Sequence, residues 1–170
     1  MFTNARSLPS KIGELEALVH EENYDLIGIA ESWLHSSHDW AINIPGYALF
    51  RKDRVKRRGG GVCLYVRSDL KVSVKEALVD GECAESEAAW VEMYMGVRNT
   101  RIIIGVCFRP PSINEEVETQ LLAQIERAAR AGTVIPMGDF FVFYNSFIYV
   151  KYNFQVYYTV IFHKDQKPRQ

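Results

Sequence analysis

The sequence predicts an α/β fold in which helices pack in layers against a mixed sheet. Two segments repeat their apolar residues with helical spacing, and short apolar runs typical of strands lie between and around them. Two of these runs are close enough to form a hairpin, which makes the sheet mixed rather than purely parallel. At 170 residues the chain is long enough to bury the core of one domain.

The start of the chain predicts a helix followed by a buried strand. Lys11–Glu22 places its apolar residues on one helical face, with Ser10 as a candidate N-cap and Asn23 as a stop. Leu26–Ala30 is a continuous apolar run, which suits a strand that is covered on both faces. Ser36–Asn43 has the composition of a loop.

The middle of the chain predicts four more strands. Tyr47–Phe50 and Val62–Val66 are strand-like and are separated by a basic stretch and by Gly59–Gly61. Three glycines permit a tight turn, which is the more common use, or the close approach of a phosphate. Trp90–Val97 and Arg101–Phe108 predict a hairpin whose second strand is apolar enough to be central.

Ser112–Arg130 is the clearest predicted helix. Its first residue and Glu115 have the spacing of a capping box, and Gly132 ends the helical pattern. Thr133–Met137 then returns to a strand, in which Pro136 removes a hydrogen-bond donor and predicts an irregular strand end.

The composition changes at Phe140. From residue 148 to residue 162 every even position is apolar, which is the period of a strand but lasts longer than most strands do. Such a segment either adds one or two strands with one apolar face or is prone to aggregation. We therefore expect a domain over residues 1–140 and an atypical, aromatic-rich, β-prone tail over residues 141–170.

Charge and cysteine content limit which partners and which cellular compartment the sequence predicts. The net charge is −1, so the total charge gives no reason to expect binding to nucleic acid. Cys63 and Cys107 lie in apolar runs, and Cys83 leaves an odd number of cysteines, which predicts core thiols in a reducing compartment. Neither a signal peptide nor a membrane span is evident. We expect an intracellular protein, nuclear or cytoplasmic, not secreted and with no membrane association, and the oligomeric state stays open.

Charged residues follow the ends of three predicted strands. Glu31, Arg109 and Asp139 each stand at or just beyond an apolar run. Two carboxylates at neighbouring strand ends would bind Mg²⁺, which would polarise a phosphate, and Asp139 could instead orient the attacking water. For Glu31 an ordinary solvent-facing acid is an equal alternative. The basic stretch Arg51–Arg58 is either a solvated loop or a phosphate-contacting surface.

Six short motifs occur in a fixed order over residues 4–140. They are Asn4-Ala-Arg-Ser-Leu, Glu31-Ser-Trp-Leu, Ile44-Pro-Gly-Tyr, the basic stretch from Arg51 with Gly59-Gly-Gly-Val, Arg109-Pro-Pro and Met137-Gly-Asp-Phe. Together they resemble the endonuclease/exonuclease/phosphatase superfamily, and most of all the endonuclease domain that accompanies the reverse transcriptases of non-LTR retrotransposons. A reverse transcriptase domain is absent from this sequence.

The resemblance implies a four-layered α/β sandwich and Mg²⁺-dependent cleavage of DNA, with Mn²⁺ as a possible substitute. It implies that Asn4 positions the scissile phosphate or the water, that Glu31 binds the metal, and that Asp139 activates the water. DNA or phosphate contacts are expected from Arg51, Arg54, Arg57, Arg58, Gly60 and Arg109.

The sequence also departs from the family pattern. Phe108 stands where the family has a tyrosine, and Phe141 stands where it has an asparagine. The second half of the family domain, with its late Ser-Asp-His signature, is not found, so the sandwich is expected to be partial, its C-terminal half missing or replaced. We expect a phosphodiesterase with weak or no activity. The alternatives are a non-catalytic nucleic-acid-binding remnant and a phosphatase of the same superfamily.

Overall fold

Two four-stranded sheets are stacked between two helices in the computed structural model, which describes residues 1–54, 59–74, 86–95, 100–110 and 113–139. The first sheet has the order β1-β2-β4-β3 and consists of β1 (Phe2–Asn4), β2 (Leu26–Ala30), β3 (Tyr47–Lys52) and β4 (Val62–Arg67). The second has the order β5-β6-β7-β8 and consists of β5 (Val72–Val74), β6 (Glu87–Met95), β7 (Thr100–Phe108) and β8 (Thr133–Asp139).

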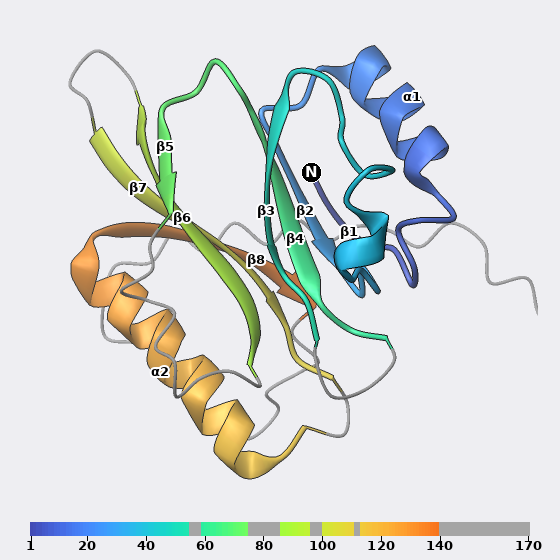
Figure 1. Cartoon of the computed structure of the whole chain (residues 1–170). Coiled ribbons are helices and arrows are strands. Elements are labelled where there is room, and N and C mark those ends of the chain that lie inside the picture. Colours follow the sequence, from blue (N-terminus) through green and yellow to red (C-terminus); the bar gives the residue numbers. More distant parts are fainter. Residues whose placement is uncertain (55–58, 75–85, 96–99, 111–112, 140–170) are drawn as a thin grey trace, which may run out of the picture.

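The helices form the outer layers of the sandwich. Helix α1 (Ile12–Glu22) covers the first sheet, where Leu15 and Val19 pack in one cluster with apolar side chains of β2 and β4. Helix α2 (Glu115–Ala131) covers the second sheet through Leu121 and Ala128. Figure 1 shows the four layers from α2 through both sheets to α1. The expected four-layered α/β arrangement is therefore confirmed.

The inner faces of the two sheets share one apolar core. Val62, Leu64 and Val66 of β4 meet side chains of β6 and β7 there, and all three are fully buried. Gly28 of β2 makes a close approach possible, because a Cβ at this position would lie 3.0 Å from Val106 Cγ2. The continuous apolar run predicted for β2 thus has its physical reason, since one face packs on the second sheet and the other on α1.

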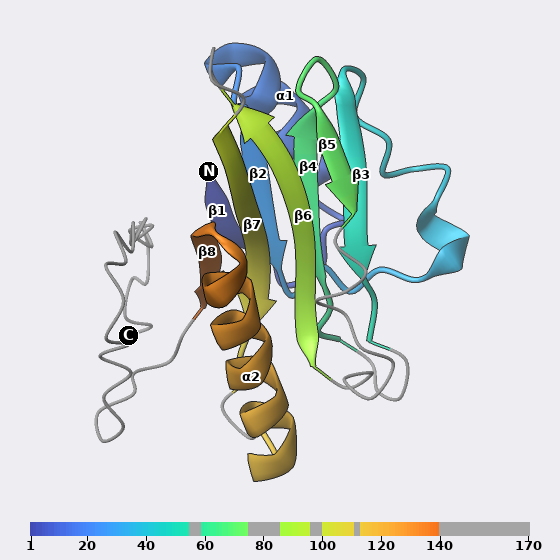
Figure 2. The ribbon, with the colours of Figure 1, turned by 90° about the vertical axis from the view of Figure 1, so that its left-hand side faces the viewer.

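The two sheets combine parallel and antiparallel pairs. In the first sheet β1 is parallel to β2, while β4 runs antiparallel to β2 and β3. In the second, β6 and β7 form the predicted antiparallel hairpin, and α2 then returns the chain so that β8 lies parallel to β7. Figure 2 shows β1 and β8 on one side of the sandwich and β3 on the other.

Several local predictions need correction. Ser10 does not cap α1, because its Oγ donates to the Ser7 carbonyl and the N-cap residue is Lys11. The cap of α2 is Asn114, whose side chain accepts from the Glu116 amide at 2.8 Å. β8 is regular through Pro136. Among the described strands it lies at the edge of its sheet, where proline is tolerated.

Other predictions are confirmed or lie outside the described residues. Asn23 ends α1 in the left-handed conformation with φ 49°. Cys63 and Cys107 are free, buried core thiols, as expected. Cys83 and the tail over residues 141–170 lie outside the described residues, so the domain boundary stays a prediction. No helix in the described ranges has both the length and the apolar character needed to cross a bilayer.

Candidate active site at the common edge of the two sheets

Chemically functional residues meet at one end of the sandwich. In the first sheet, Asn4 lies opposite Ala30, so it is level with the residue before Glu31. In the second sheet, Glu87, Phe108 and Asp139 occupy one row of the register. This edge is formed by the carboxyl ends of β1, β2, β7 and β8 and by the starts of β4 and β6. Such an edge is where α/β folds usually hold their ligands.

Asn4 and Glu31 form a direct pair at this edge. The Asn4 Nδ2 group donates to Glu31 Oε1 at 2.8 Å, while Asn4 Oδ1 accepts from the Arg6 amide at 3.2 Å. Glu31 has a φ of 50°, and its carbonyl accepts from the Ser7 amide at 2.9 Å. Two strand-end loops therefore hold the Asn4 amide and the Glu31 carboxylate together.

The turn after Glu31 is attached to the glycine turn before β4. The Ser32 amide donates to the Gly61 carbonyl at 3.1 Å, and the Trp33 amide donates to the Gly60 carbonyl at 2.9 Å. Gly60 has a φ of 72°, and a Cβ there would come within 3.0 Å of the Arg54 and Glu87 side chains. Glycine is therefore required at this position by the packing of the site itself.

Glu87 is a site residue that the sequence interpretation missed. It is only 6% exposed, and its carboxylate accepts from Arg54 Nε at 2.7 Å, from Arg54 Nη2 and from the Gly61 amide. Burial raises the pKa of Glu87, the Arg54 guanidinium opposes this, and the nearby Glu31 carboxylate adds to the increase. The available signal was an acid directly before the apolar Ala88-Ala-Trp run, but its partner Arg54 is 33 residues away in the sequence.

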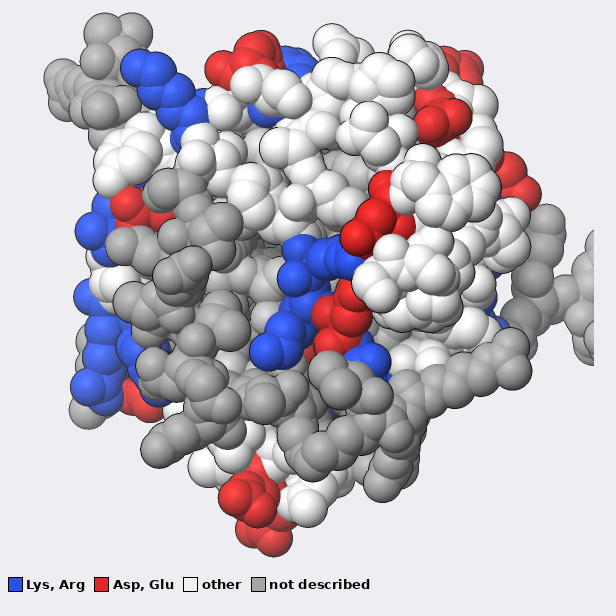
Figure 3. Space-filling view, viewed as in Figure 1, with Lys and Arg blue, Asp and Glu red and all other residues white. Residues whose placement is uncertain are grey.

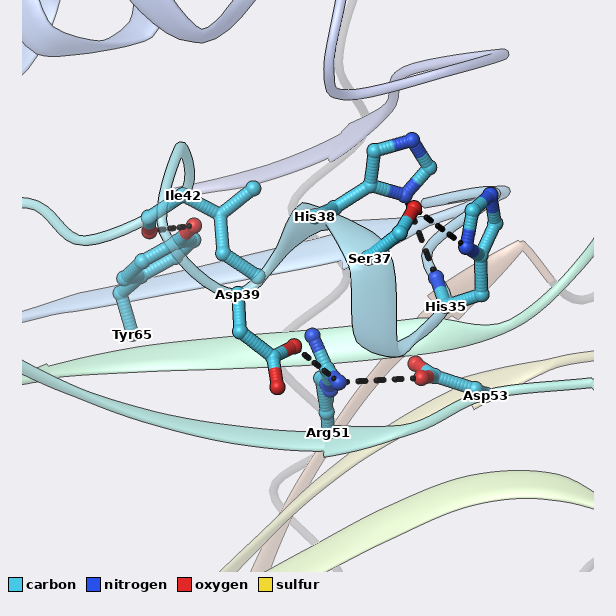
Figure 4. A network of polar contacts seen from close by, with 8 residues as sticks. All are labelled: His35, Ser37, His38, Asp39, Ile42, Arg51, Asp53 and Tyr65. Carbon is cyan, nitrogen blue, oxygen red and sulfur yellow. Dashed lines mark hydrogen bonds and ion pairs between the residues drawn. The ribbon is translucent and has the colours of Figure 1, made fainter.

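The predicted DNA-contacting arginines form ion pairs within the chain. Arg51 Nη2 lies 2.6 Å from Asp39 Oδ1 and 3.3 Å from Asp53 Oδ2, as Figure 4 shows. Arg109 Nε lies 2.8 Å from Glu118 Oε1. Figure 3 shows basic and acidic side chains next to one another on the face that carries β3. Partly exposed pairs of this kind are weak, so their engagement does not test the predicted phosphate contacts.

Three predicted site residues are described incompletely or not at all. Asp139 is the last residue of β8 and pairs with Phe108, and only its backbone is described. Arg57 and Arg58 lie outside the described residues. The roles assigned to these three residues therefore stay predictions.

A cavity of about 270 Å³ opens beside the Glu31 turn. Its walls come from the loops after β1 and β2, from within the basic stretch and from the glycine turn that follows it. They are formed by Ser7, Pro9, Trp33, Leu34, His35, His38, Arg54 and Gly59. The sequence interpretation did not single out either histidine. Their proximity depends on a short 3-10 helix over Ser36–His38, which the sequence presented only as a loop.

Residues 1–142 match the endonuclease/exonuclease/phosphatase family. The chain belongs to this family. No curated protein matches the chain significantly. Solved structures of similar fold include an AP endonuclease from Leishmania major, at a TM-score of 0.62 and 14% identity, with 81% of this chain and 53% of that chain covered.

Two further structural neighbours differ in their printed activities. The endonuclease domain of TRAS1, a telomere-specific non-LTR retrotransposon, matches at a TM-score of 0.57 and 15% identity, over 81% of this chain and 56% of that chain. A mannosyl-6-phosphatase from Bacteroides thetaiotaomicron matches at a TM-score of 0.51 and 14% identity, over 76% of this chain and 56% of that chain. The chain thus spans about half the length of these structures, and at such identities the likeness shows the fold alone.

Members of the endonuclease/exonuclease/phosphatase family generally depend on a divalent metal. The donor chemistry at the Asn4–Glu31 pair suits such an ion, because Glu31 keeps Oε2 and further lone pairs for a hard cation. Within the described ranges no three His, Cys, Asp or Glu side chains are grouped closely enough to hold a metal.

Proposed function

We propose that this chain is a divalent-metal-dependent phosphodiesterase that acts on DNA with a low rate. The observation that carries this proposal is the hydrogen bond between Asn4 and Glu31 at the common edge of the two sheets. An amide that orients a half-buried carboxylate at strand ends is suited to fixing a metal-bound phosphate. Family membership supports the hydrolysis of a phosphate ester but does not choose among diester and monoester substrates.

Each site residue has a proposed task. Glu31 holds the metal through its free carboxylate oxygen, and Asn4 fixes the orientation of that carboxylate. The metal, when bound, supplies Lewis-acid stabilisation of the phosphate charge. Asp139 is proposed to orient or deprotonate the attacking water. Phosphates of the strand are proposed to contact Arg51, Arg54, Arg57, Arg58, Gly60 and Arg109.

Glu87 extends this assignment as a positioning residue. Its carboxylate binds Arg54 and the Gly61 amide, and so it joins the second sheet to the glycine turn that holds the Glu31 loop. Loss of Glu87 would leave Arg54 without a buried partner and loosen that turn. We therefore expect Glu87 to act on the geometry of Glu31 rather than on the phosphate.

DNA is the proposed substrate, and the proposed activity is that of an endonuclease of the retrotransposon type. The likeness of fold to the TRAS1 endonuclease domain supports this choice, together with the motif order that the sequence shows. A low rate is proposed because two phosphate-contacting groups of the family pattern are replaced, with Phe108 in the place of a tyrosine and Phe141 in the place of an asparagine. A purified chain should therefore nick DNA more slowly than a family member that carries the tyrosine and the asparagine.

The test is nicking of supercoiled plasmid in Mg²⁺, with Glu31→Gln as the diagnostic variant and Glu22→Gln as its control. Glu22 is an exposed acid at the end of α1, far in the fold from the proposed edge. Slow nicking by wild-type and Glu22→Gln, lost in Glu31→Gln and in EDTA, is the expected result. Identical rates for Glu31→Gln and wild-type would refute the proposal and leave a non-catalytic nucleic-acid-binding protein as the better description.

A further inference from the structure

The cavity beside the Glu31 turn has the lining of an anion-binding site. Within the described residues that form its walls, none is acidic. Polar donors come from the Ser7 hydroxyl, from Arg54 and from the rings of His35 and His38, while Pro9, Trp33 and Leu34 form the apolar part. Polar and apolar side chains therefore share the lining of this cavity, and the polar part offers hydrogen-bond donors and a guanidinium group.

Two of these side chains, Arg54 and His38, have N–H groups left to donate hydrogen bonds to a ligand. Arg54 uses Nε and Nη2 for Glu87, which leaves Nη1 for another acceptor. The Nδ1 atom of His38 accepts from the His35 amide at 3.3 Å. A neutral imidazole that accepts at Nδ1 carries its proton on Nε2, so His38 presents an N–H donor there.

The cavity lies beside the two loops that hold Glu31. Ser7 in its wall donates its backbone amide to the Glu31 carbonyl, and Trp33 follows Glu31 by two residues. In the sequence, three basic residues connect Arg54 to Gly59, which are both wall residues. A polyanion with one phosphate at Glu31 would therefore place a neighbouring phosphate near this cavity.

We propose that this cavity binds a second phosphate group of the nucleic-acid strand, next to the phosphodiester held at Glu31. The Nε2–H group of His38, the Ser7 hydroxyl and Arg54 Nη1 supply the hydrogen bonds. This proposal rests on the proposed function for its choice of a strand rather than a free anion. It adds a binding subsite that sets where along the strand the chain engages, with His38 as a specificity-determining residue.

A pair of His38 variants separates binding from loop structure. Asparagine at this position places its side-chain oxygen near the place of Nδ1, so His38→Asn keeps an acceptor for the His35 amide and removes the Nε2 donor. Glutamine reaches the place of Nε2, so His38→Gln keeps a donor toward the cavity and loses the acceptor. The control is His20→Ala, which changes an exposed histidine in the last turn of α1.

Binding is measured on the full chain in EDTA, so that neither metal nor cleavage contributes. The probes are inorganic phosphate and a short fluorescent oligothymidine, followed by anisotropy and by the indole ¹H–¹⁵N signals. Of the three tryptophans, Trp33 lines the cavity, Trp90 is buried with its Nε1 donating to Gln124, and Trp40 is 86% exposed. The Trp33 signal should shift saturably with either probe, while that of Trp90 stays fixed.

We expect His38→Asn to weaken oligothymidine binding about three- to tenfold, the worth of one hydrogen bond. His38→Gln and His20→Ala should bind like wild-type. Equal weakening by both His38 variants, or by neither, would overturn the assignment, as would a Trp33 signal that neither probe moves. A response to inorganic phosphate alone would overturn the strand part of the proposal.

The failure of this subsite is distinguishable from the failure of the proposed function. Nicking that depends on Glu31, combined with unaltered binding in His38→Asn, would refute the subsite and leave the phosphodiesterase in place. Absence of Glu31-dependent nicking, combined with His38-dependent binding in EDTA, would refute the phosphodiesterase and leave the phosphate-binding subsite in place.

Discussion

Gly105 offers the sharpest test of how the second sheet packs against α2. It lies opposite Trp90 in the β6–β7 register, and a Cβ at this position would come within 3.0 Å of three indole ring carbons. Trp90 is 2% exposed, and its Nε1 donates to Gln124 Oε1 of α2 at 3.1 Å. The ring therefore cannot move away from Gly105 without disturbing a buried hydrogen bond.

Gly105→Ala is expected to lower the free energy of unfolding by about 2–4 kcal/mol. Overpacking a filled core costs about 1–3 kcal/mol, and weakening the buried bond between Trp90 and Gln124 adds about 1 kcal/mol. Urea denaturation followed by tryptophan fluorescence and by circular dichroism measures the change. A loss below about 0.5 kcal/mol, within the range of neutral surface changes, would refute the packing argument.

The matched control is Gly13→Ala, which makes the same chemical change in the outer layer formed by α1. Gly13 is exposed in α1, and a Cβ there would meet nothing within 4 Å. Alanine is the better helix former by about 0.8–1.0 kcal/mol. The control should therefore raise stability, so that the two glycine substitutions change the unfolding free energy in opposite directions.

Two further predictions concern buried titratable groups. Burial raises the pKa of Glu87 in the folded protein above the ordinary value of 4.5. At pH values above 4.5 the native state therefore binds more protons than the unfolded chain. Stability relative to Glu87→Gln should therefore rise as the pH falls from about 7 toward 4.5, and denaturation that shows the opposite trend would contradict the assigned shift. Burial also raises the pKa of the Cys63 and Cys107 thiols well above the ordinary value. Native Cys83→Ala protein should then show no fast-reacting thiol toward a thiol reagent and two after unfolding, and a fast native reaction would exclude the described core.

Local patterns in the sequence were sufficient for most of the elements. The β2 run, the β6–β7 hairpin and the end of α1 at Asn23 all follow from the period of apolar residues or from one stop residue. The helix starts were wrong because the path of the preceding loop decides which residue takes the N-cap position. That residue is Lys11 in α1, without a side-chain cap, and Asn114 in α2. β5 was missed because three residues carry too short a pattern to detect.

The candidate site was only partly accessible from the sequence. Motif order identified Asn4 and Glu31, and the fold brings them to 2.8 Å although they are 27 residues apart. Glu87 had no such motif, since its role depends on contacts with Arg54 and Gly61 across two sheets.

The sequence by itself determined where most of the strands and both helices lie and which chemical groups stand at several of their ends, because both depend on neighbours along the chain. Only the tertiary structure decided which strands neighbour one another in each sheet and that Glu87 and the cavity around His38 adjoin the Glu31 turn. The physical reason is that burial and hydrogen bonding act between surfaces that meet in space, whatever their separation in the sequence.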